Sequence, residues 1–157
     1  MNKNSSMRKW CLGFSLSSAA LLASATSFAR SAPASLGQSL SLSGCVTETN
    51  FGGAVKNNDK CGTETYRIPL VTDWAGRDNV LVYGSSGNRP NNLTCQAFSM
   101  TNGEGSWVTW SWSPRVTVDP AATTPVVLSL PVDIPAHGAA YVDCAIGPGS
   151  WISVVEW

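Results

Sequence analysis

Apolar and polar residues alternate in short runs from Leu40 to the end of the chain, and this alternation predicts the fold. Period-two alternation is typical of strands that bury one face. Segments dense in Gly, Pro and Asn, such as residues 84–92, separate the runs and indicate loops. The predicted strands span residues 40–45, 65–71, 80–83, 93–100, 106–113, 126–130, 139–146 and 151–157, of which 80–83 is a compact apolar run.

No window of the chain carries apolar residues at helical spacing together with capping residues. We therefore predict an all-β fold, a single antiparallel β-sandwich of about seven or eight short strands over residues 40–157. Residues 49–63 are expected to form a long surface loop. Pro69 has no N–H for a ladder hydrogen bond, and it indicates an edge strand or a bulge.

Residues 1–29 have the pattern of a signal peptide that is removed on export. Three basic residues precede an apolar run over 10–25, and Ser27-Phe28-Ala29 supplies the small residues that signal peptidase requires. We predict cleavage near Ala29, with Ala25 as a second candidate; Ala32 is disfavoured because a proline follows it. The run is too short and too polar for a stable membrane span. We expect a secreted, extracellular or periplasmic mature chain that begins with a flexible lead-in over residues 30–39.

The charge of the mature chain argues against a nucleic-acid partner. Removal of the leader would leave seven basic and ten acidic residues, a net charge of about −3. The remaining basic residues are scattered along the sequence, whereas nucleic-acid binding needs a concentrated positive surface.

Four cysteines remain after the leader, and they indicate two disulfides. An even number in an exported chain is typical of a disulfide framework, although four cysteines can pair in three ways. We favour Cys45–Cys61, which closes a loop over an Asn- and Gly-rich segment, and Cys95–Cys144, which joins two predicted strands. The chain has no Cys-x-x-Cys pair and one histidine, so we expect no metal and no other cofactor.

The aromatic stretch over residues 107–112 is the most suggestive candidate for binding. Strand alternation would place Val108, Trp110 and Trp112 on one face, which we assign to the core. Trp107 would then share the wetter face with Thr109 and Ser111. An exposed indole beside polar groups can stack on a sugar ring. The competing interpretation is structural, because Trp and Tyr commonly cover small β cores.

Candidate binding residues follow from that stretch and from the loop over residues 84–92. Trp107 and Thr109 come first, and Arg89 and Asn91 in the loop come second. We predict no catalytic residue.

Catalysis is not indicated by any motif. A Ser-His-acid triad would need His137, which lies in a predicted turn, and residues 84–87 lack the Gly-x-Ser-x-Gly spacing. The acidic residues mostly fall in predicted turns, where carboxylates bond to nearby backbone. A secreted hydrolase, or a protease inhibitor acting through Arg89-Pro90, remains the alternative. An outer-membrane-associated β protein is a second alternative, because the chain ends in an alternating strand with Trp157.

Short motifs of the mature chain resemble a group of small, uncharacterised, exported β proteins that are common in myxobacteria. The matching stretches are Val80-Leu81-Val82-Tyr83, Thr94-Cys95-Gln96-Ala97-Phe98, Tyr141-Val142-Asp143-Cys144-Ala145-Ile146 and Ile152-Ser153-Val154-Val155. Those proteins often carry a cysteine directly before the Pro-Leu of the second strand, where this chain has Ile68, so Cys61 would have to take its place. The resemblance implies the β fold and no particular function.

The sequence thus predicts a secreted or cell-surface, non-enzymatic β-sandwich with a binding or structural role. Carbohydrate binding is the sharpest form of this hypothesis, with a polysaccharide or an extracellular matrix component as the expected partner.

Overall fold

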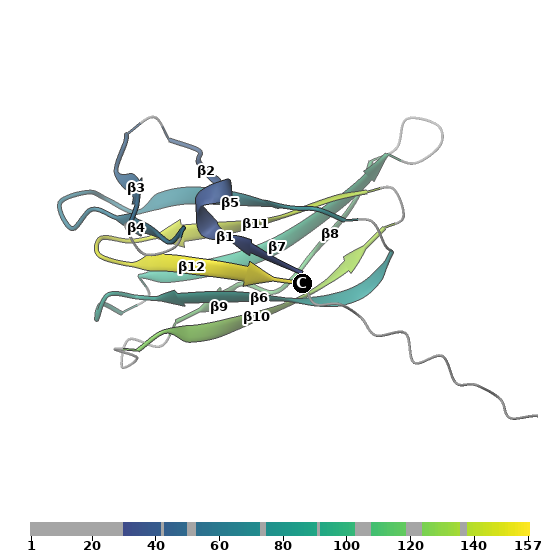
Figure 1. Cartoon of the computed structure of the whole chain (residues 1–157). Coiled ribbons are helices and arrows are strands. Elements are labelled where there is room, and N and C mark those ends of the chain that lie inside the picture. The colour runs from purple at the N-terminus through teal and green to yellow at the C-terminus, as the bar shows by residue number, and fades with distance from the viewer. Residues whose placement is uncertain are drawn as a thin grey trace, which may run out of the picture.

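Two antiparallel sheets lie face to face in the computed structural model of the protein (Figure 1). The structure describes residues 30–157 except 42, 50–52, 73–74, 91, 103–107, 119–123 and 136–137, and at 102, 108 and 109 it describes the backbone alone. The elements are β1 (Ser31–Pro33), the 3-10 turn η1 (Ala34–Leu36), β2 (Gln38–Ser39), β3 (Val46–Glu48), β4 (Val55–Asn57), β5 (Glu64–Leu70), β6 (Gly76–Ser85), β7 (Leu93–Asn102), β8 (Val108–Trp112), β9 (Val116–Thr117), β10 (Val126–Ile134), β11 (Ala139–Ile146) and β12 (Trp151–Glu156).

One sheet has the strand order β10-β6-β12-β4-β3, with β1 paired to β12. The other has the order β2-β5-β11-β7-β8, with β9 paired to β7. The predicted all-β, antiparallel sandwich is therefore confirmed, and the long strands fall on the predicted alternating runs. We call the first the β12 sheet and the second the β11 sheet, after their central strands.

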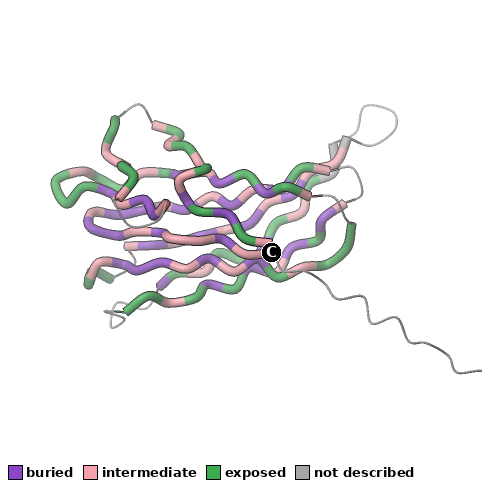
Figure 2. Tube along the Cα trace, viewed as in Figure 1, coloured by how far each residue is buried: buried purple, intermediate pink, exposed green. Residues whose placement is uncertain are grey.

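The core lies between the sheets and follows the period-two pattern. Buried residues alternate with exposed or half-buried ones along the long strands, as Figure 2 shows. In β11, for example, Val142, Cys144 and Ile146 are fully buried, and the residues between them lie on the outer side. Facing residues of the β12 sheet, such as Val80 and Val82, complete the apolar layer.

The flexible lead-in predicted for residues 30–39 is wrong. Ser31–Pro33 forms β1, which pairs with Val154–Glu156 of β12, and Arg30 and Trp157 exchange two main-chain hydrogen bonds of 2.7 and 2.9 Å. Ala32 and Ala34 are buried in the core. A segment that is low in bulky apolar residues therefore still contributes to the core.

The predicted surface loop over residues 49–63 also contains core structure. It includes β4, where Val55 and Asn57 are buried. The amide of Asn57 donates to the carbonyls of Gly62 and Ile146, at 2.8 and 2.6 Å. These two bonds replace hydration of the buried amide nitrogen, and they fasten the segment to the end of β11.

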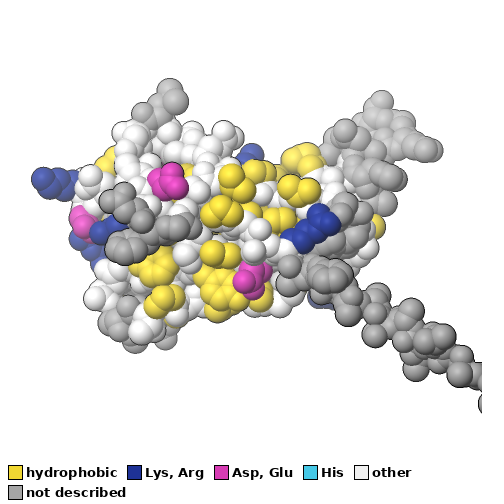
Figure 3. Space-filling view, viewed as in Figure 1, with side chains coloured by type: hydrophobic (Ala, Val, Ile, Leu, Met, Phe, Trp, Pro, Cys, Tyr) yellow, Lys and Arg dark blue, Asp and Glu magenta, His cyan; other side chains and the backbone are white. Residues whose placement is uncertain are grey.

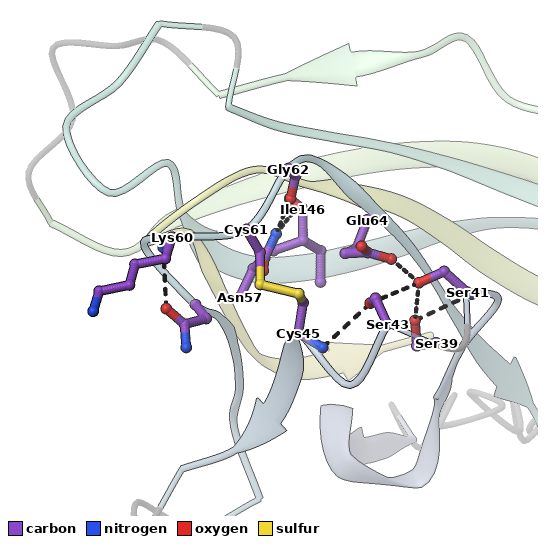
Figure 4. The surroundings of a disulfide bond; sticks show 11 residues. Ser39, Ser41, Ser43, Cys45, Asn57, Lys60, Cys61, Gly62, Glu64 and Ile146 are labelled. Atoms are coloured by element: carbon purple, nitrogen blue, oxygen red, sulfur yellow. Dashed lines mark hydrogen bonds between the residues drawn. A yellow bond between two sulfur atoms is a disulfide. The ribbon is translucent and has the colours of Figure 1, made fainter.

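Cys45 bonds to Cys61, and Cys95 bonds to Cys144. These are the two pairs that the sequence analysis favoured. Figure 4 shows the first bridge beside Asn57, where it joins the segment before β3 to the turn after β4. The second links two buried residues that lie directly opposite each other in β7 and β11.

Prolines occupy edge positions in both sheets. β5 pairs with β11 over its whole length. On its other side, β2 pairs with Tyr66 and Arg67, and Leu40 N–H donates to the Thr65 carbonyl; the described residues pair no strand with Pro69 on that side. Pro69 therefore lies on an open edge, as predicted. Pro131 lies in the middle of β10, the edge strand of the β12 sheet. Neither proline can donate a hydrogen bond to an incoming strand.

Removal of either disulfide should destabilise the protein, and by different amounts. Sequence separations of 16 and 49 residues correspond to about 3 and about 4 kcal/mol of unfolding free energy in the chain-entropy model. We expect urea unfolding of Cys95→Ala/Cys144→Ala to show the larger loss, because this pair also lies in the core. A larger loss of unfolding free energy in Cys45→Ala/Cys61→Ala would contradict the greater contribution given to the Cys95–Cys144 bridge.

Stability should fall in alkali partly because of Tyr66. Burial of this phenol raises its pKa, and the charge of Glu48 adds to the effect. Because the folded-state pKa is raised, Tyr66 adds to the unfolding free energy in full below the unfolded-state pKa of 10.0. This contribution is lost as the pH rises through the folded-state pKa. Urea unfolding at about pH 8 and about pH 11 measures the effect. Between these two pH values, Tyr66→Phe should lose less unfolding free energy than the wild type does. Equal losses would show that Tyr66 carries no such effect.

Candidate functional site

The outer face of the β11 sheet carries the most exposed tryptophans of the described part of the chain. Trp110 and Trp112 of β8 are 48% and 64% exposed. They pair across β7 with Met100 and Phe98, which also lie on the outer side. The two indoles and their partners form a continuous apolar strip along the β7–β8 hairpin.

This orientation overturns the prediction that Trp110 and Trp112 face the core. Serines occupy the inward positions instead: Ser111 pairs with the buried Ser99, and Ser113 is fully buried. Backbone groups satisfy the hydroxyls of Ser99 and Ser113. Ser99 donates to the carbonyl of Asp133, and Ser113 donates to that of Pro114 and accepts from Ala97 N–H. Alternation along β8 distinguished two faces but did not show which one was buried.

Outward side chains of neighbouring strands form ranks across the β11 sheet. The strand register places them side by side in the combinations Ala139, Met100 and Trp110; Pro69, Tyr141, Phe98 and Trp112; Arg67, Asp143 and Gln96; and Thr65, Ala145, Thr94 and Thr117. The aromatic rank is the one that contains Tyr141, Phe98 and Trp112. The charged rank, with Arg67 and Asp143, lies next to it, and the hydroxyl rank, with its three threonines, follows.

Tyr141 is held between two neighbours. Its ring stacks on Phe98 with centroids 5.2 Å apart and planes 19° apart, and the guanidinium carbon of Arg67 lies 4.0 Å from its centroid. Because Phe98 and Arg67 come from strands on opposite sides of β11, both faces of Tyr141 are covered. The exposed indole of Trp112 therefore offers a better stacking surface than the Tyr141 ring does.

Arg67 is fixed by a two-pronged ion pair. Its Nε and Nη2 donate to the two carboxylate oxygens of Asp143, each at 2.7 Å. The hydrogen bond to Asp143 raises the pKa of the Arg67 guanidinium, so the side chain stays charged. This pair holds Arg67 over Tyr141 and neutralises its charge.

A depression of about 340 Å³ lies beside the aromatic rank. Phe98 forms one wall, and Gln96, Arg115 and Asp143 supply polar groups. Gln96 donates to the Ser113 carbonyl at 2.8 Å and accepts from Arg115 Nε at 3.2 Å, so its amide orientation is set. Thr65, Thr94, Cys95 and Ala145 complete the lining.

This combination of an exposed indole and an oriented polar depression suits a ligand with an apolar face and a hydroxylated rim. Binding sites commonly pair apolar contact area with a few placed polar groups, and a sugar ring has both kinds of surface. Within the described ranges, no three His, Cys, Asp or Glu side chains gather as metal ligands.

The structure does not bring together Arg89 and Thr109, the two sequence-predicted binding residues whose backbone it describes. Trp107 and Asn91, like His137, lie outside the described residues. Arg89 is exposed in the loop before β7, whereas the backbone of Thr109 pairs with Thr101 near the other end of that strand.

Sequence reasoning missed Trp112, Gln96, Arg67 and Asp143. The sequence carried a signal for Gln96 and Asp143. Thr94, Gln96, Phe98 and Met100 occupy every second position, on the strand face opposite Cys95, and Tyr141 and Asp143 lie likewise on the face opposite Cys144.

The outer face of the β12 sheet has a second, more apolar depression of about 560 Å³. Trp151 and Tyr83 line it together with Thr49, Ala54, Lys56, Pro125 and Ser153. The hydroxyl of Tyr83 donates to Glu156 at 2.8 Å, and this bond raises the pKa of Tyr83. Figure 3 shows apolar side chains gathered over β6 and β12 on this face, with an acidic side chain beside them.

No family model and no curated protein matches the chain. Solved structures do match. The C-terminal CBM6 of LamC, a marine laminarinase from Zobellia galactanivorans, shares 12% identity at a TM-score of 0.50 and covers 82% of this chain and 98% of its own.

Two further structures align over a similar share of this chain. The carbohydrate-binding module CBM6cm-2 from Cellvibrio mixtus lichenase 5A, in complex with cellotriose, shares 13% identity at a TM-score of 0.48, covering 81% of this chain and 94% of its own. An exo-beta-1,3-galactanase from Phanerochaete chrysosporium with galactose shares 15% identity at a TM-score of 0.49. The alignment covers 82% of this chain and 29% of the galactanase chain. The LamC match shows a shared fold: the chain is a β-sandwich of the kind seen in a carbohydrate-binding module. No helix among the described residues is long and apolar enough to cross a membrane.

Loss of the Arg67 side chain should loosen the outer face without unfolding the protein. We expect Arg67→Ala to lower the unfolding free energy by about 1 kcal/mol, because it removes a half-exposed ion pair and a cation–π contact together. Lys56→Ala is the matched control, since its single contact with Asp59 is 3.5 Å long and exposed. Urea unfolding that shows equal effects for both variants would contradict the role given to the Arg67 contacts.

Proposed function

We propose that the protein is an exported, non-enzymatic carbohydrate-binding module. A polysaccharide would lie on the outer face of the β11 sheet, with one sugar ring stacked on Trp112. The observation that carries this proposal is the exposure of Trp112 and Trp110 beside the oriented polar groups of the depression. The fold shared with the LamC module supports it at the level of architecture.

Physical reasoning favours the β11 face over the β12 face. Trp112 is largely exposed, whereas Trp151 is half-buried. Gln96 and Arg115 lie close by with N–H groups that can donate to ring and hydroxyl oxygens. Stacking would place the apolar face of a sugar against the indole and leave its hydroxyls for these groups.

The two disulfides support an oxidising location, outside the cytoplasm. We propose that the protein works extracellularly or in the periplasm, where polysaccharides are accessible. The partner would be a polysaccharide or a matrix that contains one.

Trp112→Ala should weaken binding about tenfold or more while leaving the fold intact. Truncation of a central aromatic contact commonly costs more than 1 kcal/mol of binding free energy, and a tenfold change in Kd is about 1.4 kcal/mol. Because Trp112 is exposed, its loss should change the unfolding free energy by less than about 0.5 kcal/mol. Intrinsic fluorescence of the oxidised protein, titrated with soluble plant, algal and bacterial-wall polysaccharides, measures the effect.

Trp151→Ala is the matched control, because it removes a tryptophan from the outer face of the other sheet. Loss of binding in Trp151→Ala alone would move the site to the β12 face, and loss in Trp107→Ala alone would favour the residue chosen from sequence. A wild-type protein that binds no polysaccharide in the panel would refute the proposal.

A further inference from the structure

The depression beside the aromatic rank carries an uncompensated positive charge. Arg115 lines it, and its only side-chain hydrogen bond to a described residue is the 3.2 Å bond from Nε to the neutral Gln96. The other cation nearby, Arg67, is neutralised by Asp143. Among the described residues, Arg115 therefore has no carboxylate partner.

This positive charge contrasts with the remainder of the domain. Residues 30–157 carry a net charge of about −3, so general electrostatics would repel an anionic ligand. An anion would bind only where a local cation faces it. The depression supplies one. Arg115 Nε bonds to Gln96, and its two Nη groups, which have no hydrogen-bond partner among the described residues, can form a forked pair of hydrogen bonds.

The position of Arg115 relative to Trp112 fits two neighbouring units of one chain. Gln96 precedes Phe98 by two residues on the outer face of β7. Trp112 pairs with Phe98, and Arg115 donates a hydrogen bond to Gln96. Two residues of a strand span about 7 Å. That distance is comparable with the length of one sugar unit in an extended polysaccharide.

We propose that the site selects a polysaccharide with uronic acid units. One sugar would stack on Trp112, and the carboxylate of an adjacent unit would bind the Nη groups of Arg115. This inference rests on the proposed function, since it names the ligand class of the same site. A planar carboxylate can accept two parallel hydrogen bonds from the guanidinium fork, and the experiment below separates it from a sulfate ester.

The test compares polygalacturonate with the same polymer after full methyl esterification, which keeps the backbone and removes the charge. We expect the oxidised protein to bind the acid form about tenfold more tightly at low salt, and the preference to shrink as salt rises. Arg115→Gln should abolish the preference, and Arg115→Lys should retain part of it. Lys60→Gln removes the same charge from an exposed position outside the depression and should change nothing.

The outcomes separate this inference from the proposed function. Equal binding of the acid and the ester, or a preference that survives in Arg115→Gln, would overturn the uronate assignment and leave carbohydrate binding in place. Tighter binding of a sulfated galactan than of polygalacturonate would overturn the choice of a carboxylate. If the protein binds a neutral polysaccharide more tightly and Trp112→Ala abolishes that binding, the uronate inference fails and the proposed function stands. If it binds no polysaccharide, both fail.

Discussion

The register between β7 and β11 is the constraint on which both faces of the molecule depend. Cys95 and Cys144 lie directly opposite each other and are covalently joined, so these strands cannot slip relative to one another. A slip of one residue would exchange inner and outer side chains along the strand. The bridge thus keeps Val142 and Ile146 in the core and, by the same register, holds Tyr141 and Asp143 in their ranks on the outside.

Much of the fold could be predicted from sequence because the long strands obey one simple rule. In β5, β10 and β11, apolar residues mostly alternate with polar ones, and only one face can be buried. Residues 30–39 lack such a pattern, since their buried members are two alanines that are covered because β1 pairs with β12 and η1 packs against β12 and β5. Those contacts belong to the tertiary structure and have no local sequence signal.

The candidate site was harder to predict for a related reason. In β8, hydrophobicity alone assigns the tryptophans to the interior and the serines to solvent, but the structure does the reverse. Buried serines cost little when backbone groups satisfy their hydroxyls, and those partners come from distant segments such as Asp133. The polar half of the site depends likewise on contacts between strands, because Arg67 and Asp143 are 76 residues apart in sequence.

Pro69 and Pro131 limit how copies of the protein can associate through the edges of their sheets. Each interrupts the row of N–H donors on an open strand edge, so a neighbouring copy would find an incomplete template for sheet extension. Two copies that met along β10, or along the end of β5 that carries Pro69, would therefore remain separate sheets and would not extend into one.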